Sequence, residues 1–187
     1  MGLAILALVA MNAVNLFDHA DGLVGLLVPM AMAAGKAPLA PLFGVAAAGY
    51  LPFNLFIRRA SDEDFEDLEG ERTRSAPMAM LGDSGSHLAG VLLATTPGAC
   101  WLLALPVLDM VRVVLGRLRR GRPFWQGDRS HLGHVLHGIG FSPVSSALLV
   151  GTLLLPILAA VALMDGPAPL IAGLLATDAL YSGMLVM

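Results

Sequence analysis

Seven long apolar segments constrain the fold of this chain more than any other feature of its sequence. They contain few charges and alternate with polar stretches, covering residues 1–16, 22–35, 38–56, 86–97, 99–116, 143–164 and 168–187. Over the whole chain 57% of residues are hydrophobic and 13% are charged, whereas soluble domains have about 25% charged residues. Because roughly 20 apolar residues suffice to cross a bilayer, the sequence predicts an integral membrane protein.

The apolar segments are expected to be helices. In lipid each backbone polar group needs a partner within the protein, and the alternating pattern of a barrel strand is absent from these segments. We therefore predict an all-α, polytopic bundle of about 6–7 transmembrane helices, with residues 1–187 as one membrane domain. Segments 22–35 and 86–97 are short for complete spans. The single cysteine, Cys100, excludes disulfides within the chain and thiolate metal clusters.

The basic residues predict the orientation in the membrane. Short loops rich in lysine and arginine stay in the cytoplasm, and all 11 basic residues except Lys36 fall in two regions, 58–74 and 112–129. Alternating the segments from there places Asp18 and Asp21 on the same cytoplasmic side. Lys36 and the turn at Asp165 are expected outside.

Two cytoplasmic stretches interrupt the apolar segments. Residues 57–78 form an acidic insertion, "RRASDEDFEDLEGERTRS" at its centre, for which we expect a solvated loop or a short exposed helix. A regulatory or partner-binding role is the alternative. Residues 117–142 form the second stretch, a loop that carries His131, His134 and His137 at spacings of three. Histidines facing lipid headgroups are the alternative to histidines that bind a substrate.

The most informative motif is "NAVNLFDHADGLVG", residues 12–25. Asn15 and Asp18 lie one helical turn apart on one face, and Asp21 follows before Gly22 interrupts the helix. Carboxylates at a membrane boundary are costly unless they have a function. Ordinary acids at a helix end are the alternative.

A second motif, "LGDSGSH", begins at residue 81. Asp83 is flanked by glycines that allow a ligand to approach the backbone, and Ser84 and Ser86 are expected to cap the following helix. A glycine and serine turn without a ligand is the alternative. Mg²⁺ prefers oxygen ligands and shares them with substrate phosphates, so the carboxylates of Asp18, Asp21 and Asp83 suit a site for phosphoryl transfer.

One further acid, Asp109, lies within an apolar segment. It is expected to pair with Arg112 one turn later. Acids inside membrane segments also mark transport pathways, so a transporter is one hypothesis for the function. Against it, the polar motifs gather at one face and do not line a site at the midplane of the membrane.

These motifs together resemble the polyprenyl-phosphate N-acetylhexosamine-1-phosphate transferases, the glycosyltransferase family 4 superfamily of the MraY and WecA enzymes. "NAVNLFDHADGL" is similar to its Asn-x-x-Asp-Gly-x-Asp-Gly-Leu motif, and "YLPFNLF" with "LGDSGS" to its Phe-Asn and Met-Gly-Asp-x-Gly-Ser pair. "LDMVRVVLGRLRRGRPFWQGDRSHLGH" is similar to its ninth helix and histidine loop. The form "DRSHLGH" favours the WecA-like branch.

The resemblance implies transfer of an N-acetylhexosamine 1-phosphate, with N-acetylglucosamine as the expected sugar, from a UDP-sugar to undecaprenyl phosphate. UMP is released, and a lipid-linked glycan of the cell envelope is begun. The implied cofactor is Mg²⁺, with Mn²⁺ as a substitute. The implied partners are UDP-N-acetylhexosamine, undecaprenyl phosphate and membrane lipid, without nucleic acid and with a homodimer left open. The implied location is the bacterial cytoplasmic membrane, with the active face toward the cytoplasm.

The resemblance also assigns roles to residues. It implies catalytic acids at Asp18, Asp21 and Asp83, with Asp83 as the metal ligand. The residues expected to bind substrate are Asn15, Asn54, Ser86, Arg129, His131 and His134.

The chain departs from the family at its start. The resemblance implies a start inside the family's fifth helix, so we expect the C-terminal part of a transferase, without about four helices and an adjacent pair of aspartates. Acting alone, such a chain is expected to show little or no turnover. The alternative from a different class is a non-catalytic membrane module that binds the sugar nucleotide or the lipid, or that completes a site in another chain.

Overall fold

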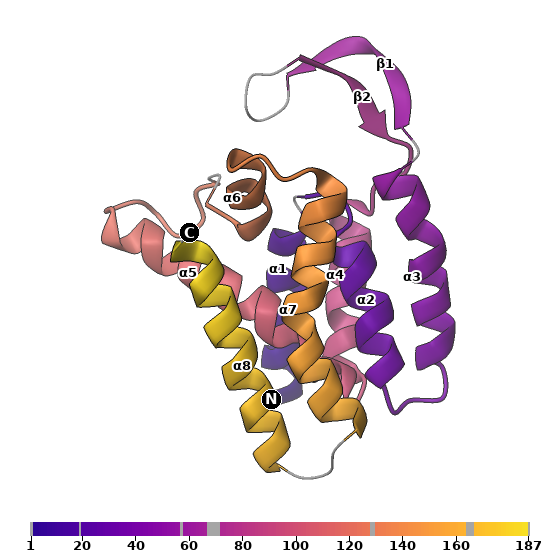
Figure 1. The fold of residues 1–187 in the computed structure, drawn as a ribbon, viewed down its shortest axis with the longest axis vertical. Coiled ribbons are helices and arrows are strands. Elements are labelled where there is room, and N and C mark those ends of the chain that lie inside the picture. Colours follow the sequence, from indigo (N-terminus) through magenta and orange to yellow (C-terminus); the bar gives the residue numbers. More distant parts are fainter. Residues whose placement is uncertain are drawn as a thin grey trace.

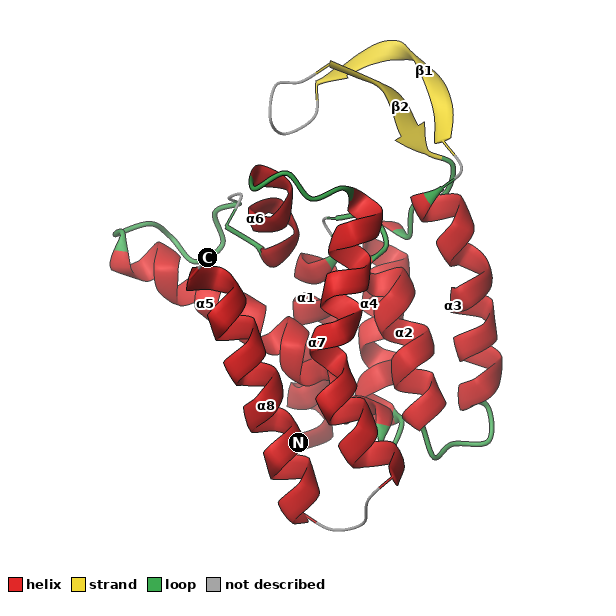
Figure 2. Ribbon diagram, in the orientation of Figure 1, coloured by secondary structure: helices red, strands yellow, loops and turns green. Residues whose placement is uncertain are grey.

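Helices account for most of the described structure (Figures 1 and 2). The computed structural model describes residues 2–18, 20–56, 58–66, 72–127, 130–163 and 167–186. The elements are α1 (Gly2–Phe17), α2 (Leu23–Ala34), α3 (Ala40–Leu55), β1 (Arg58–Glu66), β2 (Arg72–Pro77), α4 (Gly82–Thr95), the 3₁₀ helix η1 (Ala99–Leu103), α5 (Ala104–Arg119), α6 (Leu132–Gly138), α7 (Pro143–Leu163) and α8 (Pro167–Val186).

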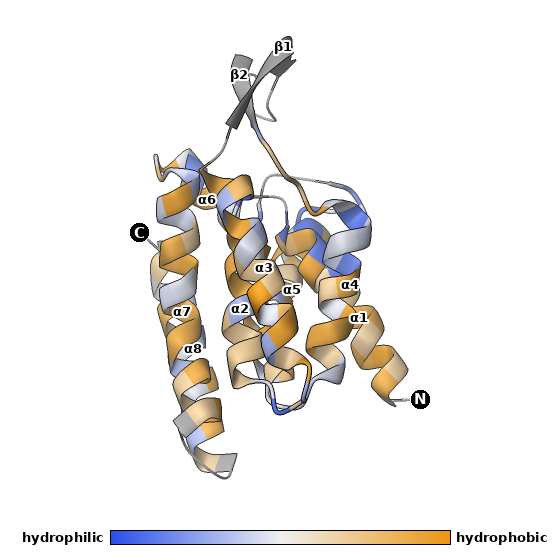
Figure 3. Cartoon of the chain, turned by 90° about the vertical axis from the view of Figure 1, so that its right-hand side faces the viewer, coloured by the Kyte–Doolittle hydropathy of each residue, from blue (hydrophilic) through white to orange (hydrophobic). Residues whose placement is uncertain are grey.

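The long helices run between two ends of the bundle (Figure 1). The C-terminal ends of α1, α3, α5 and α8 lie at one end, together with the first turns of α2, α4 and α7 and with α6. We call this the polar end, because it collects the motifs around Asp18 and Asp83. The loop with Lys36 lies at the opposite end, as the alternation of segments predicts. Figure 3 shows hydrophobic colour over most of the helices.

Three helical stretches of the described chain are long and apolar enough to cross a membrane: Ala99–Arg119, Pro143–Ala162 and Ala168–Leu185. The apolar helices α1, α2 and α3 are shorter. They pack into the same core, where Phe17, Leu27 and Leu93 are almost completely buried. The structure therefore confirms the prediction of an all-α membrane bundle.

The acidic insertion differs from its prediction. Instead of a loop or a short helix, the described backbone forms two antiparallel strands, β1 and β2, which pair from Arg58 opposite Pro77 to Glu66 opposite Arg72 with an irregularity between. This hairpin projects from the polar end, beyond α3 (Figure 2). The charged side chains do not indicate a strand in the sequence. Strand pairing uses backbone N–H and C=O groups, which every pair of strands can offer whatever its side chains are.

Helix α4 packs directly against α1, and Gly90 sets the distance between them. A Cβ atom at Gly90 would lie 2.7 Å from both the Ala10 carbonyl oxygen and the Met11 Cα atom. Backbone atoms of a packed helix cannot move aside as a flexible side chain can. The close approach therefore depends on glycine, and it brings the ends of α1 and α4 together at the polar end.

We predict that Gly90→Ala lowers the stability of the bundle, since overpacking a tight contact costs about 1–3 kcal/mol. Gly49→Ala in α3 is the matched control, because its new Cβ would meet nothing within 4 Å. The control should gain about 0.5–1 kcal/mol from removing a helical glycine. Thermal unfolding in detergent micelles measures both, and equal midpoints for the two variants would refute this account of α1 and α4.

Candidate active site

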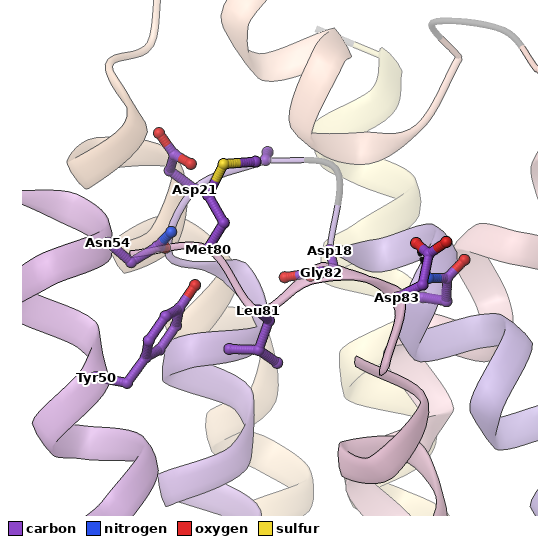
Figure 4. A pocket seen from close by; sticks show the side chains of 10 residues that line it. Asp18, Asp21, Tyr50, Asn54, Met80, Leu81, Gly82 and Asp83 are labelled. Carbon is purple, nitrogen blue, oxygen red and sulfur yellow. Dashed lines mark hydrogen bonds between the residues drawn. The ribbon is translucent and has the colours of Figure 1, made fainter. Parts of the chain in front are cut away.

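A cavity of about 270 Å³ opens at the polar end between α1, α3 and α4. Figure 4 shows Asp21, Tyr50 and Asn54 on one side of it and Asp83 on the other. Polar side chains from segments far apart in the sequence therefore share one space. The lining residues are Asn15, Asp18, Ala20, Asp21, Tyr50, Asn54, Met80, Leu81, Gly82 and Asp83.

The turn after α1 places the first two acids. The Asp18 N–H still donates to the Val14 carbonyl at 3.0 Å, and the chain then turns at Gly22, whose φ is 85°. Side chains rarely adopt this left-handed conformation, and a Cβ there would lie 2.5 Å from the Leu55 side chain. Gly22 thus interrupts the helix as predicted, and the turn aims Asp18 and Asp21 at the cavity.

Asn54 fixes this turn to the segment before α4. Its Oδ1 accepts a hydrogen bond from the Gly22 N–H at 2.6 Å, and its Nδ2 donates to the Ala79 carbonyl at 3.0 Å. The side chain is 5% exposed, so these bonds are sheltered from water. Asn54 therefore lies at the cavity as predicted, and it also joins three segments of the wall.

Tyr50 lines the same cavity and was missed by the motifs. It stands four residues before Asn54 in α3, and residues at this spacing share a helix face. That spacing is the signal that could have found it.

Asp83 enters the cavity from the first turn of α4, where an acid is favoured by the helix dipole. The helix begins at Gly82, so the prediction that Ser84 and Ser86 cap it is wrong: both lie inside the helix. The Ser86 hydroxyl instead donates to the carbonyls of Gly82 and Asp83, each at 3.1 Å. The Ser86 hydroxyl is thus satisfied by carbonyls one turn back in its own helix, an alternative to capping that serine offers inside a helix.

The Asn15 amide joins α1 to this first turn. Its Nδ2 donates to Asp83 Oδ1 at 3.1 Å and to Ser86 Oγ at 3.0 Å. Because α1 and α4 approach closely along their length, one amide reaches both residues. The structure thus brings together five of the predicted site residues around the cavity, with Ser86 directly behind them.

The surroundings of Asp18 raise the pKa of its carboxyl group. Burial, together with the negative charges of Asp21 and Asp83, raises the pKa of Asp18 from 3.8 to about 7. Removal from water and like charges both disfavour the ionised form. Three carboxyl groups thus share one cavity, and a cation placed beside them would favour their ionised forms.

The raised pKa predicts how stability depends on pH in the absence of metal. Between pH about 4 and about 7 the folded protein keeps a proton on Asp18 that the unfolded chain has lost, so stability should fall as pH rises through this window. Asp18→Asn should remove most of that fall. Asp178→Asn, an exposed acid of α8, should retain it, and an unchanged slope in Asp18→Asn would contradict the assignment.

The histidine segment lies at the polar end but does not line this cavity. His131 is 4% exposed, and its Nδ1 lies 2.9 Å from Asp109 Oδ2. His134 is half-buried on α6, and Arg129 lies outside the described residues. A direct contact of these three residues with a substrate stays a prediction.

Asp109 pairs with Arg112 at 2.9 Å, which confirms the expected contact one turn later. Its other partners, His131 and Tyr181, come from far along the chain. No spacing in the sequence connects them, so this cluster could not be predicted.

No set of three histidine, cysteine or acidic side chains in the described part of the chain is arranged to hold a metal alone. Mg²⁺ usually takes only one or two carboxylates, with water and substrate phosphates completing its shell. A pair of acids at the cavity therefore meets its requirement.

The fold and this site define a polytopic helical membrane protein with an acidic cavity at one end of its bundle. Comparison with known proteins agrees with that class. The chain is similar to the undecaprenyl-phosphate alpha-N-acetylglucosaminyl 1-phosphate transferases of Escherichia coli strain K12 (31% identity over 180 residues, 83% of this chain) and Salmonella typhi (32% over 177 residues, 81% of this chain). The enzyme of Yersinia pestis is 29% identical over 163 residues, 75% of this chain.

The chain belongs to the polyprenyl-phosphate N-acetylhexosamine-1-phosphate transferase superfamily, as its motifs predict. It spans 41–45% of the length of these three relatives, which agrees with the expectation of a C-terminal part. No family model matches the chain, and no solved structure matches it significantly.

Proposed function

We propose that this chain binds UDP-N-acetylglucosamine in the cavity at the polar end and takes part in transferring N-acetylglucosamine 1-phosphate to undecaprenyl phosphate. The observation that carries the proposal is the meeting of Asp18, Asp21 and Asp83 in one cavity. The relatives are named for this transfer. The same residues carry the motifs by which the chain resembles the superfamily.

The cavity fits Mg²⁺. Burial and the negative charges of Asp21 and Asp83 raise the pKa of Asp18 to about 7, and a cation would relieve the repulsion between these acids. Asp83 is the proposed ligand, with Asp18 or Asp21 sharing the ion directly or through water. A bound Mg²⁺ would neutralise the charge of the diphosphate. Mn²⁺ has similar ligand preferences and could replace it.

The chain's own residues would orient the substrate around this ion. Asn15 holds Asp83 in place through its amide, while Asn54 and Ser86 fix the walls of the cavity. His134 and Arg129 are proposed to approach the phosphates from the histidine loop. In the transfer, an oxygen of undecaprenyl phosphate bonds to the phosphorus that carries the sugar, the bond from that phosphorus to the bridging oxygen breaks, and UMP leaves with that oxygen.

The polar end is proposed to face the cytoplasm in the bacterial cytoplasmic membrane. Arg117, Arg119, Arg120 and Arg122 follow or end α5 at this end, and arginine-rich loops stay on the cytoplasmic side. UDP-sugars are made in that compartment, so the cavity would open toward its substrate.

A second candidate is a non-catalytic module that binds the sugar nucleotide without transferring its sugar phosphate. It is favoured by the extent of the match, since the chain spans 45% of the Escherichia coli relative. Both candidates require nucleotide binding in the cavity. They differ in turnover alone.

The proposal predicts Mg²⁺-dependent binding of UDP-N-acetylglucosamine by the purified chain in lipid nanodiscs, measured by calorimetry. Asp83→Asn should weaken this binding at least about tenfold, because replacing even a residue that only hydrogen-bonds to a metal ligand lowers metal affinity by about that factor or more. Asp178→Asn is the matched control and should bind as the wild type does.

Two outcomes separate the candidates. Transfer of labelled sugar phosphate to undecaprenyl phosphate with release of UMP establishes the enzyme, whereas binding without transfer establishes the module. Absence of Mg²⁺-dependent binding in the wild type would overturn both.

A further inference from the structure

Asp109 is the centre of a buried hydrogen-bond network that no motif predicts. The residue lies within α5 and is 1% exposed. Its Oδ1 accepts bonds from Arg112 Nη2 at 2.9 Å, from the Tyr181 hydroxyl at 2.8 Å and from the Leu132 backbone N–H at 3.1 Å. Its Oδ2 lies 2.9 Å from His131 Nδ1. Four partners on one carboxylate account for the presence of an acid in an apolar helix.

The network joins three separate parts of the chain. Leu132 is the first residue of α6, Tyr181 belongs to α8, and Arg112 is one turn beyond Asp109 in α5. Arg112 also donates from Nε to the Tyr181 hydroxyl at 2.6 Å and from Nη2 to the Ser130 carbonyl. The start of α6 is therefore bonded to the membrane helices α5 and α8 through the carboxylate of Asp109.

The loop leading to α6 is tied to α5 as well. Arg117, which is 3% exposed, places Nη2 3.3 Å from His131 Nε2 and donates from Nη1 to the Phe124 carbonyl at 2.8 Å. Both ring nitrogens of His131 are thus engaged within the protein. Such a histidine fixes a backbone and has no free nitrogen for a phosphate.

We propose that Asp109 and Tyr181 are positioning residues, which hold the start of α6 so that His134 reaches the substrate bound in the acidic cavity. His131 belongs to the same positioning network and does not itself bind phosphate. The inference rests on the proposed function. It assigns a role to α8, a helix in which the resemblance to the superfamily identified no functional residue.

Tyr181→Phe tests the proposal with little change of volume. It removes the bond from the Tyr181 hydroxyl to Asp109 and the bond that Arg112 donates to the same hydroxyl, and it leaves the ring in place, so the helices should still pack. One hydrogen bond to a charged group is worth about tenfold or more in an equilibrium constant. We therefore expect the dissociation constant of UDP-N-acetylglucosamine with Mg²⁺ to rise about tenfold, while the protein still unfolds in one cooperative transition in the nanodisc, at a lower midpoint.

A double-mutant cycle distinguishes positioning from general damage. If Tyr181 acts through the placement of α6, Tyr181→Phe should weaken nucleotide binding little further in the His134→Ala background. In the Asp83→Asn background it should weaken binding by its full factor. Thr177→Val is the matched control, because Thr177 is a buried hydroxyl of α8 that bonds only to the Leu153 carbonyl among the bonds described. An effect of Tyr181→Phe that adds fully to His134→Ala, or that Thr177→Val reproduces, would overturn the proposal.

A second measurement keeps the test independent of nucleotide binding. His134→Cys in a Cys100→Ala background gives the chain one thiol, whose alkylation by a polar maleimide reports the placement of α6. Adding Tyr181→Phe should accelerate labelling severalfold. If the wild type binds no UDP-N-acetylglucosamine, the proposed function fails, and an unchanged labelling rate would then overturn the positioning network as well.

Discussion

The hydrogen bonds from the Asn15 amide to Asp83 and Ser86 are the contact on which the rest of the site depends. They join the end of α1 to the first turn of α4, and they are possible because the two helices approach closely at Gly90. Without that approach Asp83 would lie apart from Asp18 and Asp21. A packing constraint between two membrane helices is thus what gathers the acids into one cavity.

Asp109 and Asp18 are both partly or fully buried acids, but their surroundings have opposite effects on their charge. Asp109 is surrounded by donors from Arg112, Tyr181 and the start of α6, so its charge is compensated within the protein. Asp18 is partly buried beside other carboxylates, and both effects raise its pKa to about 7. The first arrangement stabilises the bundle, whereas in the second a bound cation would favour the ionised carboxylate.

Sequence patterns predicted what depends on neighbours along the chain and missed what depends on neighbours in space. Hydrophobicity placed the helices, and glycine at position 22 placed the turn after α1, because both act locally. The hairpin in the acidic insertion was missed because backbone pairing leaves no mark in a charge run. Tyr181 and the buried state of His131 could not be predicted, since their partner Asp109 is 72 and 22 residues away.

In the proposed site, Asp18, Asp21 and Asp83 share one cavity, and a bound cation takes the place of a proton. Proton release on Mg²⁺ binding can be measured by calorimetry at pH about 6.5 in two buffers with different heats of ionisation. The wild type should release a substantial fraction of a proton per Mg²⁺, and Asp18→Asn should release almost none. Mg²⁺ binding without proton release, or equal release by both proteins, would contradict this proposal.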